Sequence, residues 1–397
     1  MTIKSFASLF EYFDRLKLQI LFCLVWFVPN LCLGQKMVEV DLPSRELGEV
    51  RKIWISLPAH YELRHDKYHL VVLLDGDNSS LLNYTVSAKR YLEENAVDLS
   101  DYNTPEAILV GIEQKDRGKD FGKNAAQFLN FLSKEVLPYL TVNYRIENYK
   151  ILIGHSLAGR FALYTFTHDF GLFNAVIAIS PAYPESATPK VIVELDSVLH
   201  NGLKQDAAIY LFTTYLPNDQ TEMQFRGFAE AFAAHSNSLK IPNFRFQFDT
   251  SSTLGHGKSP YLAVPKGLHF VYDPKYWQLN VDSLTDVHLD PLAVYYHYEQ
   301  YLERRFGIRQ PMGIYTGLIA GRLQRSGRIK EAIELLKARA ADDPTDLYLF
   351  SKLLSLLKVT AAPEYKTNYD HFIAVMNACN TPIDDKKYYL HQIQESQ

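Results

Sequence analysis

Residues 151–159 read Ile-Leu-Ile-Gly-His-Ser-Leu-Ala-Gly, and this stretch decides the fold. Three apolar residues typical of a strand run directly into small residues, and a helical pattern begins immediately afterwards. In a nucleophile elbow, such a strand-to-helix turn carries a serine at its tip, here Ser156. Gly154, Ala158 and Gly159 are small, as expected for a strained turn in which bulky side chains would collide with the neighbouring strand and helix. The free N–H groups at the start of the helix would support negative charge that develops beside the serine.

The motif Gly-x-Ser-x-Gly is short, and this copy departs from it. Ala158 stands where the second glycine is usual, and Gly159 follows one place later. An ordinary strand-to-helix turn with a small polar residue would give the same pattern. The rest of the chain therefore has to decide between a nucleophile and a plain turn.

Short apolar stretches alternate with helical patterns over the first two thirds of the chain. The predicted strands span residues 37–42, 50–57, 69–74, 107–112, 150–154, 175–180, 208–213 and 244–248, and helix-like stretches include residues 82–94, 125–140 and 225–235. The first two strands look like an antiparallel pair, and the others have the composition of strands buried on both faces. This alternation predicts an α/β fold with a doubly wound, mostly parallel eight-stranded sheet, in which the serine follows the fifth strand.

Ligands of such sheets bind at the carboxyl ends of the strands, where this chain places a serine, acidic residues and a histidine in that order. The order Ser, acid, His is that of a hydrolytic triad on this fold. His256 would take the proton of Ser156 and later return it to the leaving alcohol. A carboxylate would orient the imidazole ring. Asp219, in the loop after the seventh strand, is the first choice, Glu222 is the alternative and Asp249 is third.

A tetrahedral oxyanion needs two backbone N–H donors that are already in place. The amide of Leu157, directly after the serine, is one candidate. The amide of Asp77, after Asp75-Gly76 at the end of the third strand, is the other. Residues of these types also favour plain turns, so the alternative for the Asp75–Asp77 segment is a turn without a catalytic role.

A set of short segments follows in order along the chain: Leu74-Asp75-Gly76-Asp77, Val110-Gly111-Ile112, Phe131-Leu132 through Leu137-Pro138-Tyr139, Asn143-Tyr144-Arg145, Gly154-His155-Ser156-Leu157-Ala158-Gly159, Ile179-Ser180-Pro181 and His256-Gly257-Lys258-Ser259-Pro260. In this order they make the chain resemble the esterase D-like hydrolases, a family of esterases that includes enterobactin-type siderophore esterases, feruloyl and acetyl esterases and S-formylglutathione hydrolases. The resemblance covers residues 40–275. It implies an α/β-hydrolase fold, ester cleavage through an acyl-serine, no metal and no organic cofactor.

Some residues depart from the family pattern. Ala182-Tyr183 stands where Ser-Leu-Trp is frequent, and residues 215–222 do not match the usual acidic loop. Arg117 could hold an anionic group of the substrate, as the resemblance to siderophore esterases suggests, although a solvated loop charge is the alternative. Tyr183 and Tyr215 could stack on an aromatic acyl group. In a chain with 26 tyrosines, simple packing is the alternative for both.

The N-terminal residues 1–35 look like an export signal. Lys4, Arg15 and Lys17 precede the apolar run 18–33, which is short for a membrane span. The alternative is an uncleaved N-terminal membrane anchor. We expect an exported protein, periplasmic or secreted, whose only membrane contact would be an uncleaved N-terminal segment.

Charge and cysteine content narrow the function further. The formal net charge is −4 and no basic run is present, which leaves a nucleic-acid partner unsupported. Two of the three cysteines lie in the signal-like segment, so a processed chain would keep only Cys379 and would have no internal disulfide.

The last third of the chain is helical in pattern from about residue 291. Residues 314–327, 328–340 and 347–357 have the spacing of helix-turn-helix units, and residues 327–333 with Asp343-Pro344 resemble a tetratricopeptide repeat. Fewer than three repeats are evident, so these helices should pack on themselves or on the hydrolase part. We expect three regions: 1–35, the hydrolase at 36–275, and the helical region at 276–397, whose helices are a possible surface for a protein partner.

Two functional hypotheses follow. The first is a serine esterase that cleaves carboxylic esters through an acyl-serine, with small-molecule siderophore-type esters or glycan acyl esters as substrates. The second is a binding or scaffold protein on a retained hydrolase fold, acting through its helices. An acyltransferase that uses the same acyl-serine is a minor third hypothesis.

Overall fold

The computed structural model describes residues 37–59, 61–63, 65–94, 103–200, 203–280, 283–284, 286–308, 313–379, 381 and 383–395. The predicted export signal at residues 1–35 lies outside these residues. From Met37 onward the described residues form one compact unit. No helix among them combines the length and the apolar character that crossing a membrane requires.

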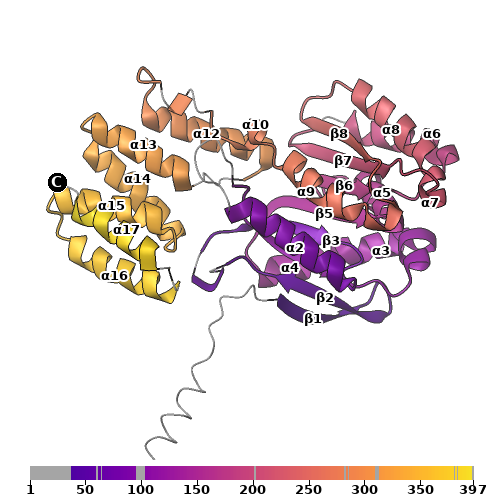
Figure 1. The fold of residues 1–397 in the computed structure, drawn as a ribbon, viewed down its shortest axis with the longest axis horizontal. Coiled ribbons are helices and arrows are strands. Elements are labelled where there is room, and N and C mark those ends of the chain that lie inside the picture. Colours follow the sequence, from indigo (N-terminus) through magenta and orange to yellow (C-terminus); the bar gives the residue numbers. More distant parts are fainter. Residues whose placement is uncertain are drawn as a thin grey trace, which may run out of the picture. The chain divides into compact units, whose positions relative to one another are not determined.

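The centre of the fold is an eight-stranded sheet with the strand order β1-β2-β4-β3-β5-β6-β7-β8 (Figure 1). The strands are β1 (Met37–Ser44), β2 (Glu49–Ser56), β3 (Tyr68–Leu73), β4 (Ala107–Ile112), β5 (Ile146–His155), β6 (Ala175–Ile179), β7 (Ala207–Thr214) and β8 (Phe244–Ser251). β2 pairs antiparallel with β1 and with β4, and the remaining pairs are parallel. Each predicted strand is therefore confirmed, and so is the mostly parallel sheet.

Helices cover both faces of the sheet because alternate residues of each strand point to opposite sides. Val71 and Leu73 of β3 belong to one apolar cluster, together with side chains of α2 (Ser79–Glu94) and α9 (Pro260–Val271). Leu70 and Val72 of the same strand belong to the other cluster. That second cluster includes side chains of α3 (Ala125–Phe131), α4 (Leu137–Asn143), α5 (Leu157–His168), α6 (Thr188–Leu199) and α8 (Arg226–Ser238). This doubly wound layering is the α/β-hydrolase arrangement.

The helix predicted at residues 125–140 contains a wider turn. α3 ends at Phe131, one π-helical turn spans Leu132–Val136, and α4 begins at Leu137 with Pro138 in its first turn. Proline has no backbone N–H, which is consistent with a regular helix starting again at that point.

The C-terminal third is helical, as predicted. Its helices are α12 (Pro291–Phe306), α13 (Gly313–Arg325), α14 (Ile329–Asp342), α15 (Leu347–Val359), α16 (Tyr365–Ala378) and α17 (Ile383–Gln394), and the last two lie beyond the predicted helices. The predicted boundary at residues 275/276 falls inside the short helix α10 (Pro274–Trp277).

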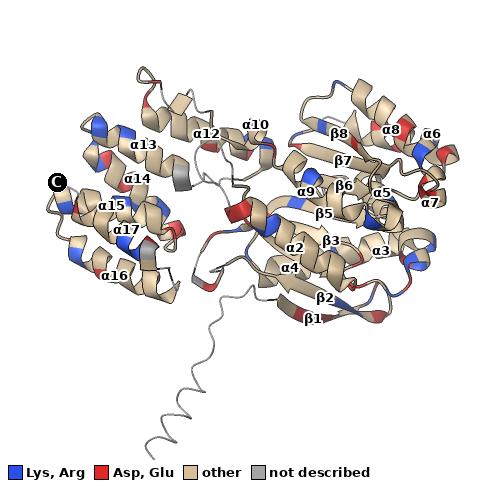
Figure 2. Cartoon of the chain, viewed as in Figure 1, with Lys and Arg blue, Asp and Glu red and all other residues tan. Residues whose placement is uncertain are grey.

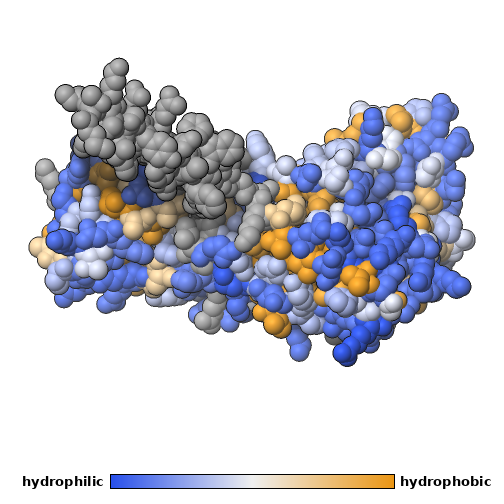
Figure 3. Space-filling view, turned by 90° about the horizontal axis from the view of Figure 1, so that it is seen from below, coloured by the Kyte–Doolittle hydropathy of each residue, from blue (hydrophilic) through white to orange (hydrophobic). Residues whose placement is uncertain are grey.

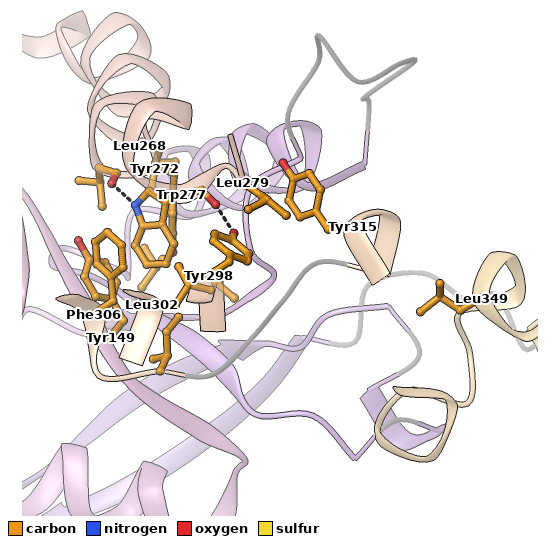
Figure 4. Packing of buried hydrophobic residues seen from close by; sticks show 14 of the residues in the cluster. Tyr149, Leu268, Tyr272, Trp277, Leu279, Tyr298, Leu302, Phe306, Tyr315 and Leu349 are labelled. Atoms are coloured by element: carbon orange, nitrogen blue, oxygen red, sulfur yellow. Dashed lines mark hydrogen bonds between the residues drawn. The ribbon is translucent and has the colours of Figure 1, made fainter. Parts of the chain in front are cut away.

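The apolar cluster on the α2/α9 face of the sheet continues into these helices. Trp277 stacks on Phe306 of α12 with ring centroids 3.7 Å apart, and its indole N–H donates to the carbonyl of Val271 (Figure 4). The Tyr298 hydroxyl donates in turn to the carbonyl of Trp277. The sheet and α12 therefore share one apolar core.

Charges of both signs are interspersed along the described elements (Figure 2). On the face shown in Figure 3, apolar residues form small patches within a largely hydrophilic surface. The distribution agrees with the near balance of 41 basic and 45 acidic side chains in the sequence.

Candidate active site

Ser156 lies in the turn between β5 and α5, with a backbone φ of 61° and ψ of −118°. This left-handed conformation is unfavourable for a residue with a side chain and has to be held by its surroundings. The N–H of Ser156 donates to the carbonyl of Ile179, and its own carbonyl accepts from Arg160 and Ala182. The strained turn predicted from the sequence is thus present.

Close backbone contacts explain why the residues around Ser156 are small. A Cβ atom on Gly154 would lie 2.2 Å from the carbonyl oxygen of Ala158, and one on Gly159 would lie 2.8 Å from the carbonyl oxygen of Ile179. The position that closely approaches β6 is therefore residue 159. Ala158 itself is fully buried with its methyl group accommodated. The altered motif preserves the elbow because Gly159, which has no side chain, stands at the position that lies against β6.

His256 follows β8 and begins the short 3-10 turn His256–Lys258. Its Nε2 lies 2.9 Å from Oγ of Ser156, and its Nδ1 lies 2.9 Å from Oε1 of Glu222. When Nδ1–H donates to the carboxylate, Nε2 is free to accept the serine hydroxyl proton. The two polar side chains predicted from distant segments, Ser156 and His256, are therefore brought together.

The carboxylate against the imidazole ring is that of Glu222, which corrects the first choice made from the sequence. The side chain of Glu222 is fully buried, and its second oxygen accepts a hydrogen bond from the Thr213 hydroxyl at 2.7 Å. Asp219 does not reach the ring. Its carboxylate accepts from the backbone N–H of Glu222 at 3.1 Å and of His256 at 2.7 Å. Asp249, the third choice, accepts instead from the Tyr210 hydroxyl at 2.8 Å.

Local helix chemistry explains this outcome. Asp219 is the N-cap of the four-residue helix α7 (Gln220–Met223), so its carboxylate is occupied by backbone groups. Glu222, in the first turn of that helix, has the longer side chain and reaches the ring. Burial raises the pKa of Glu222, but hydrogen bonds from His256, Ser180 and Thr213 outweigh it and hold that pKa below its ordinary value. The group is therefore ionised at neutral pH.

The amides of Leu157 and Asp77 are free to act as donors. Leu157 is the first residue of α5, so its N–H has no intrahelical partner. Asp77 follows Asp75, which has a φ of 58°, and Gly76, where a Cβ atom would lie 2.4 Å from the backbone of Gly111. Within the described residues neither amide donates to a recorded acceptor. Their use as an oxyanion hole belongs to the proposal below.

Arg117 forms an ion pair with Asp75 and is partly exposed. Its Nε and Nη2 donate to the two carboxylate oxygens of Asp75 at 2.8 and 3.0 Å, and Nη2 also donates to the carbonyl of His155 at 3.0 Å. The guanidinium thereby links the segment that carries Asp77 to the segment that carries Ser156. The side chain of Arg117 remains 41% exposed, so it is also reachable from solvent.

Tyr183 and Tyr215 make packing contacts. Tyr183 is 7% exposed, stacks near Phe228 with centroids 4.5 Å apart and lies under Arg160. Burial raises the pKa of Tyr183 to about 12. The Tyr215 hydroxyl donates to Glu230 at 2.6 Å. The Tyr215 ring lies under Arg226, so both rings contact other side chains of the protein. Stacking of either ring on a substrate stays a prediction.

His155 is a site residue that the sequence analysis did not identify. Its Nε2 lies 2.9 Å from the carbonyl oxygen of His256, and the two rings are 4.7 Å apart. Burial is the main cause that lowers the pKa of His155 to about 3, and the neighbouring side chains of His256 and Arg117 lower it further. The ring is therefore neutral and donates Nε2–H to that carbonyl. The only sequence signal is its place directly before the serine.

The comparisons with known proteins agree with this fold. Residues 44–237 match the model of the family described as "Putative esterase". The comparison with curated proteins gives no match. Among solved structures, an IroE-like serine hydrolase from Shewanella oneidensis is 20% identical with a TM-score of 0.58, and the match covers 76% of this chain and 98% of that one.

Two further structures show how far the likeness extends. An uncharacterised protein from Capnocytophaga ochracea is 16% identical with a TM-score of 0.59, and the match covers 91% of this chain and 99% of that one. The BES protein from Bacillus cereus is 19% identical with a TM-score of 0.50, covering 60% of this chain and 94% of that one. At these identities the likeness shows the fold. The match to the Capnocytophaga ochracea protein, which covers 91% of this chain, includes most of the C-terminal helices.

Proposed function

We propose, for a chain whose residues 44–237 match the model of the family described as "Putative esterase", that the protein cleaves carboxylic esters through an acyl-serine intermediate on Ser156. One observation carries the proposal: Ser156 Oγ, His256 and the buried carboxylate of Glu222 form a continuous hydrogen-bonded chain with two contacts of 2.9 Å. Such a chain activates a serine hydroxyl and stabilises the imidazolium that forms. The description of the Shewanella oneidensis relative as a serine hydrolase supports the same chemistry.

In the proposed reaction, Ser156 Oγ attacks the ester carbonyl carbon while His256 Nε2 takes the hydroxyl proton. The oxyanion is bound by the amides of Leu157 and Asp77. The bond to the alcohol then breaks, and His256 returns the proton to the leaving oxygen. Water, deprotonated by the same ring, releases the carboxylic acid and restores Ser156.

The substrate class is the finer part of the proposal. We place small siderophore-type esters and acyl esters of carbohydrates first, because the segments of this chain resemble those of siderophore, feruloyl and acetyl esterases. A panel containing a triscatecholate trilactone, a feruloyl saccharide and an acetylated saccharide would rank them by kcat/KM. Product masses would show whether hydrolysis or transfer to an added alcohol occurs.

A fluorophosphonate probe tests the core of the proposal. The purified protein should be labelled once, on Ser156, and should hydrolyse a p-nitrophenyl ester. Ser156→Ala should lose both properties while keeping the wild-type circular dichroism spectrum. Ser238→Ala, at the exposed C-terminal end of α8, is the matched control and should behave as wild type. A folded wild-type protein that resists labelling and hydrolysis would favour the scaffold hypothesis, in which the helices α12–α17 are the working surface.

The basic and apolar residues 1–35 support the further proposal that the protein is exported. N-terminal sequencing of the protein from fractionated cells would test it. A new N-terminus near residue 35 in the periplasm or medium is expected. An intact N-terminus in the membrane fraction would indicate an anchor instead.

A further inference from the structure

The carboxylate of Asp219 lies between the two segments that carry the proposed acid and base. Its Oδ1 accepts the backbone N–H of Glu222 at 3.1 Å, and its Oδ2 accepts the backbone N–H of His256 at 2.7 Å. These two residues are 34 positions apart in the chain. A single side chain therefore binds the main chains of both, beside the contact that their own side chains make.

The surrounding backbone is shaped for this contact. Asn218, directly before Asp219, has a φ of 66°, which turns the chain into α7. A Cβ atom on Gly255 would lie 3.0 Å from Oδ2 of Asp219, so a side chain there would crowd the carboxylate. The absence of a side chain at residue 255 lets the carboxylate reach the next N–H along the chain.

The elements joined by Asp219 have little stability of their own. α7 is four residues long, and a helix of that length is not stable in isolation. Burial raises the pKa of Asp219, but the hydrogen bonds from the backbone N–H groups of His256 and Glu222 outweigh it and lower that pKa. Asp219 is therefore ionised at neutral pH, and both bonds are charge-assisted.

The backbone carbonyl of His256 is hydrogen-bonded as well. Its carbonyl accepts from Nε2–H of His155 and from the hydroxyl of Ser259, at 2.9 and 2.8 Å. Asp219 supplies the restraint on the N–H of His256. Without it, the 3-10 turn that begins at His256 could shift relative to α7, and displacements of about 1 Å in an active site cost about 100-fold in rate.

We propose that Asp219 is a positioning residue, which fixes the distance between the Glu222 carboxylate and the His256 ring by binding both main chains. This role rests on the proposed function and adds to it a residue that touches none of the reacting atoms. It differs from the role first predicted for Asp219, which required contact with the ring.

The test uses the full-length protein with Asp219→Asn and Asp219→Ser. Asparagine is as good an N-cap as aspartate, so α7 keeps its cap, but the amide nitrogen faces the N–H of His256 and cannot accept from it. Serine likewise keeps one acceptor and loses the second. For both variants we expect kcat for a p-nitrophenyl ester and the rate of fluorophosphonate labelling to fall about tenfold or more, with KM changed less than about twofold.

The matched control is Asp273→Asn. Asp273 caps another four-residue helix, α10, by accepting the N–H of Lys275 at 2.9 Å, and it makes no recorded contact with the proposed triad. Kinetics and labelling of this variant should stay at the wild-type level. Hydrogen exchange gives a readout independent of catalysis: the peptide containing His256 should exchange faster in Asp219→Asn and unchanged in Asp273→Asn.

The outcomes separate the two proposals. Absence of labelling in the wild type would contradict the proposed function, whereas the exchange measurement would still test the contact made by Asp219. Wild-type labelling with equal rates and equal exchange in Asp219→Asn would overturn the positioning role. If the asparagine variant did not fold, Asp219→Ser would carry the same comparison.

Discussion

Oε1 of Glu222 lies 2.9 Å from Nδ1 of His256, whereas Asp219, three residues earlier, reaches only the backbone of the same histidine. The two carboxylates belong to the N-cap and the first turn of α7 and have different partners. Variants of Glu222 and of Asp219 should therefore lower kcat for different reasons and by different factors.

Glu222→Gln should lower kcat by about 10³- to 10⁴-fold, because an amide in this position favours the wrong imidazole tautomer and removes the charge that stabilises the imidazolium. The fold should be retained. Steady-state kinetics with a p-nitrophenyl ester checks this. The control is Glu230→Gln, which changes the carboxylate that accepts from the Tyr215 hydroxyl. Retention of more than about a tenth of the wild-type kcat would argue against Glu222 as the acid.

Arg117→Gln should lower kcat for a neutral ester, because the Asp75 loop that carries the Asp77 amide loses its ion pair. A role in binding an anionic group predicts something different: a raised KM for anionic esters alone. Comparing a neutral and a carboxylate-bearing p-nitrophenyl ester distinguishes the two. Arg45→Gln, at an exposed position in the turn between β1 and β2, serves as the charge-matched control.

His69 should make the protein acid-sensitive. It is fully buried between the rings of Tyr149, Tyr272 and Trp277, and burial, with the nearby charge of Lys89, lowers its pKa to about 3. Between pH 6.5 and 3 the unfolded chain therefore binds a proton at this residue that the folded protein does not. Stability falls as the pH drops through this window.

Replacing His69 by phenylalanine removes this dependence. As the pH is lowered from 6 to 4, the wild type should lose stability relative to His69→Phe. The difference between their free energies of unfolding should change by about 1.4 kcal/mol for each pH unit. Urea denaturation at several pH values measures it. His288→Gln, at an exposed position, should run parallel to the wild type. Parallel curves for His69→Phe as well would show that His69 is protonated in the folded protein.

Gly154→Ala should be strongly destabilising, by about 3 kcal/mol or more, because its Cβ would overlap the backbone of Ala158. A Cβ on Gly257 would meet nothing within 4 Å, so Gly257→Ala should change stability by less than about 0.5 kcal/mol. Thermal unfolding compares the pair. Equal midpoints would mean that the elbow can relax.

Asp206 joins the sheet to α12 from a fully buried position. Its carboxylate accepts from Arg245 at 2.6 Å and from Arg305 of α12 at 3.0 Å. Asp206→Asn should cost about 3–5 kcal/mol, because two guanidinium groups lose their buried counter-charge. The thermal midpoint measures the loss, and Asp290→Asn, which affects an ion pair of partly exposed side chains with Arg328, should stay near the wild type. A small effect at Asp206 would show that water replaces the carboxylate.

The sequence by itself determined the local elements and the order of the chemistry. Apolar runs bounded by turn residues marked β3, β4, β6 and β7 most clearly, because burial on both faces leaves a composition visible in a few residues. The elbow was also readable, since Gly154 is required by a contact with the backbone of Ala158 in the same turn. Chain order then selected Ser156 and His256, which both lie at the carboxyl ends of strands.

Only the tertiary structure decided which groups meet. Asp219 and Glu222 both carry a carboxylate and are three residues apart. Because Asp219 caps α7, Glu222 is the residue that faces the ring. The partner of Arg117 lies 42 positions away, and that of His155 lies 101 positions away. Such contacts depend on strand order and loop path, which a local pattern does not encode, because hydrogen-bond geometry is fixed within a few tenths of an ångström by the whole packed fold.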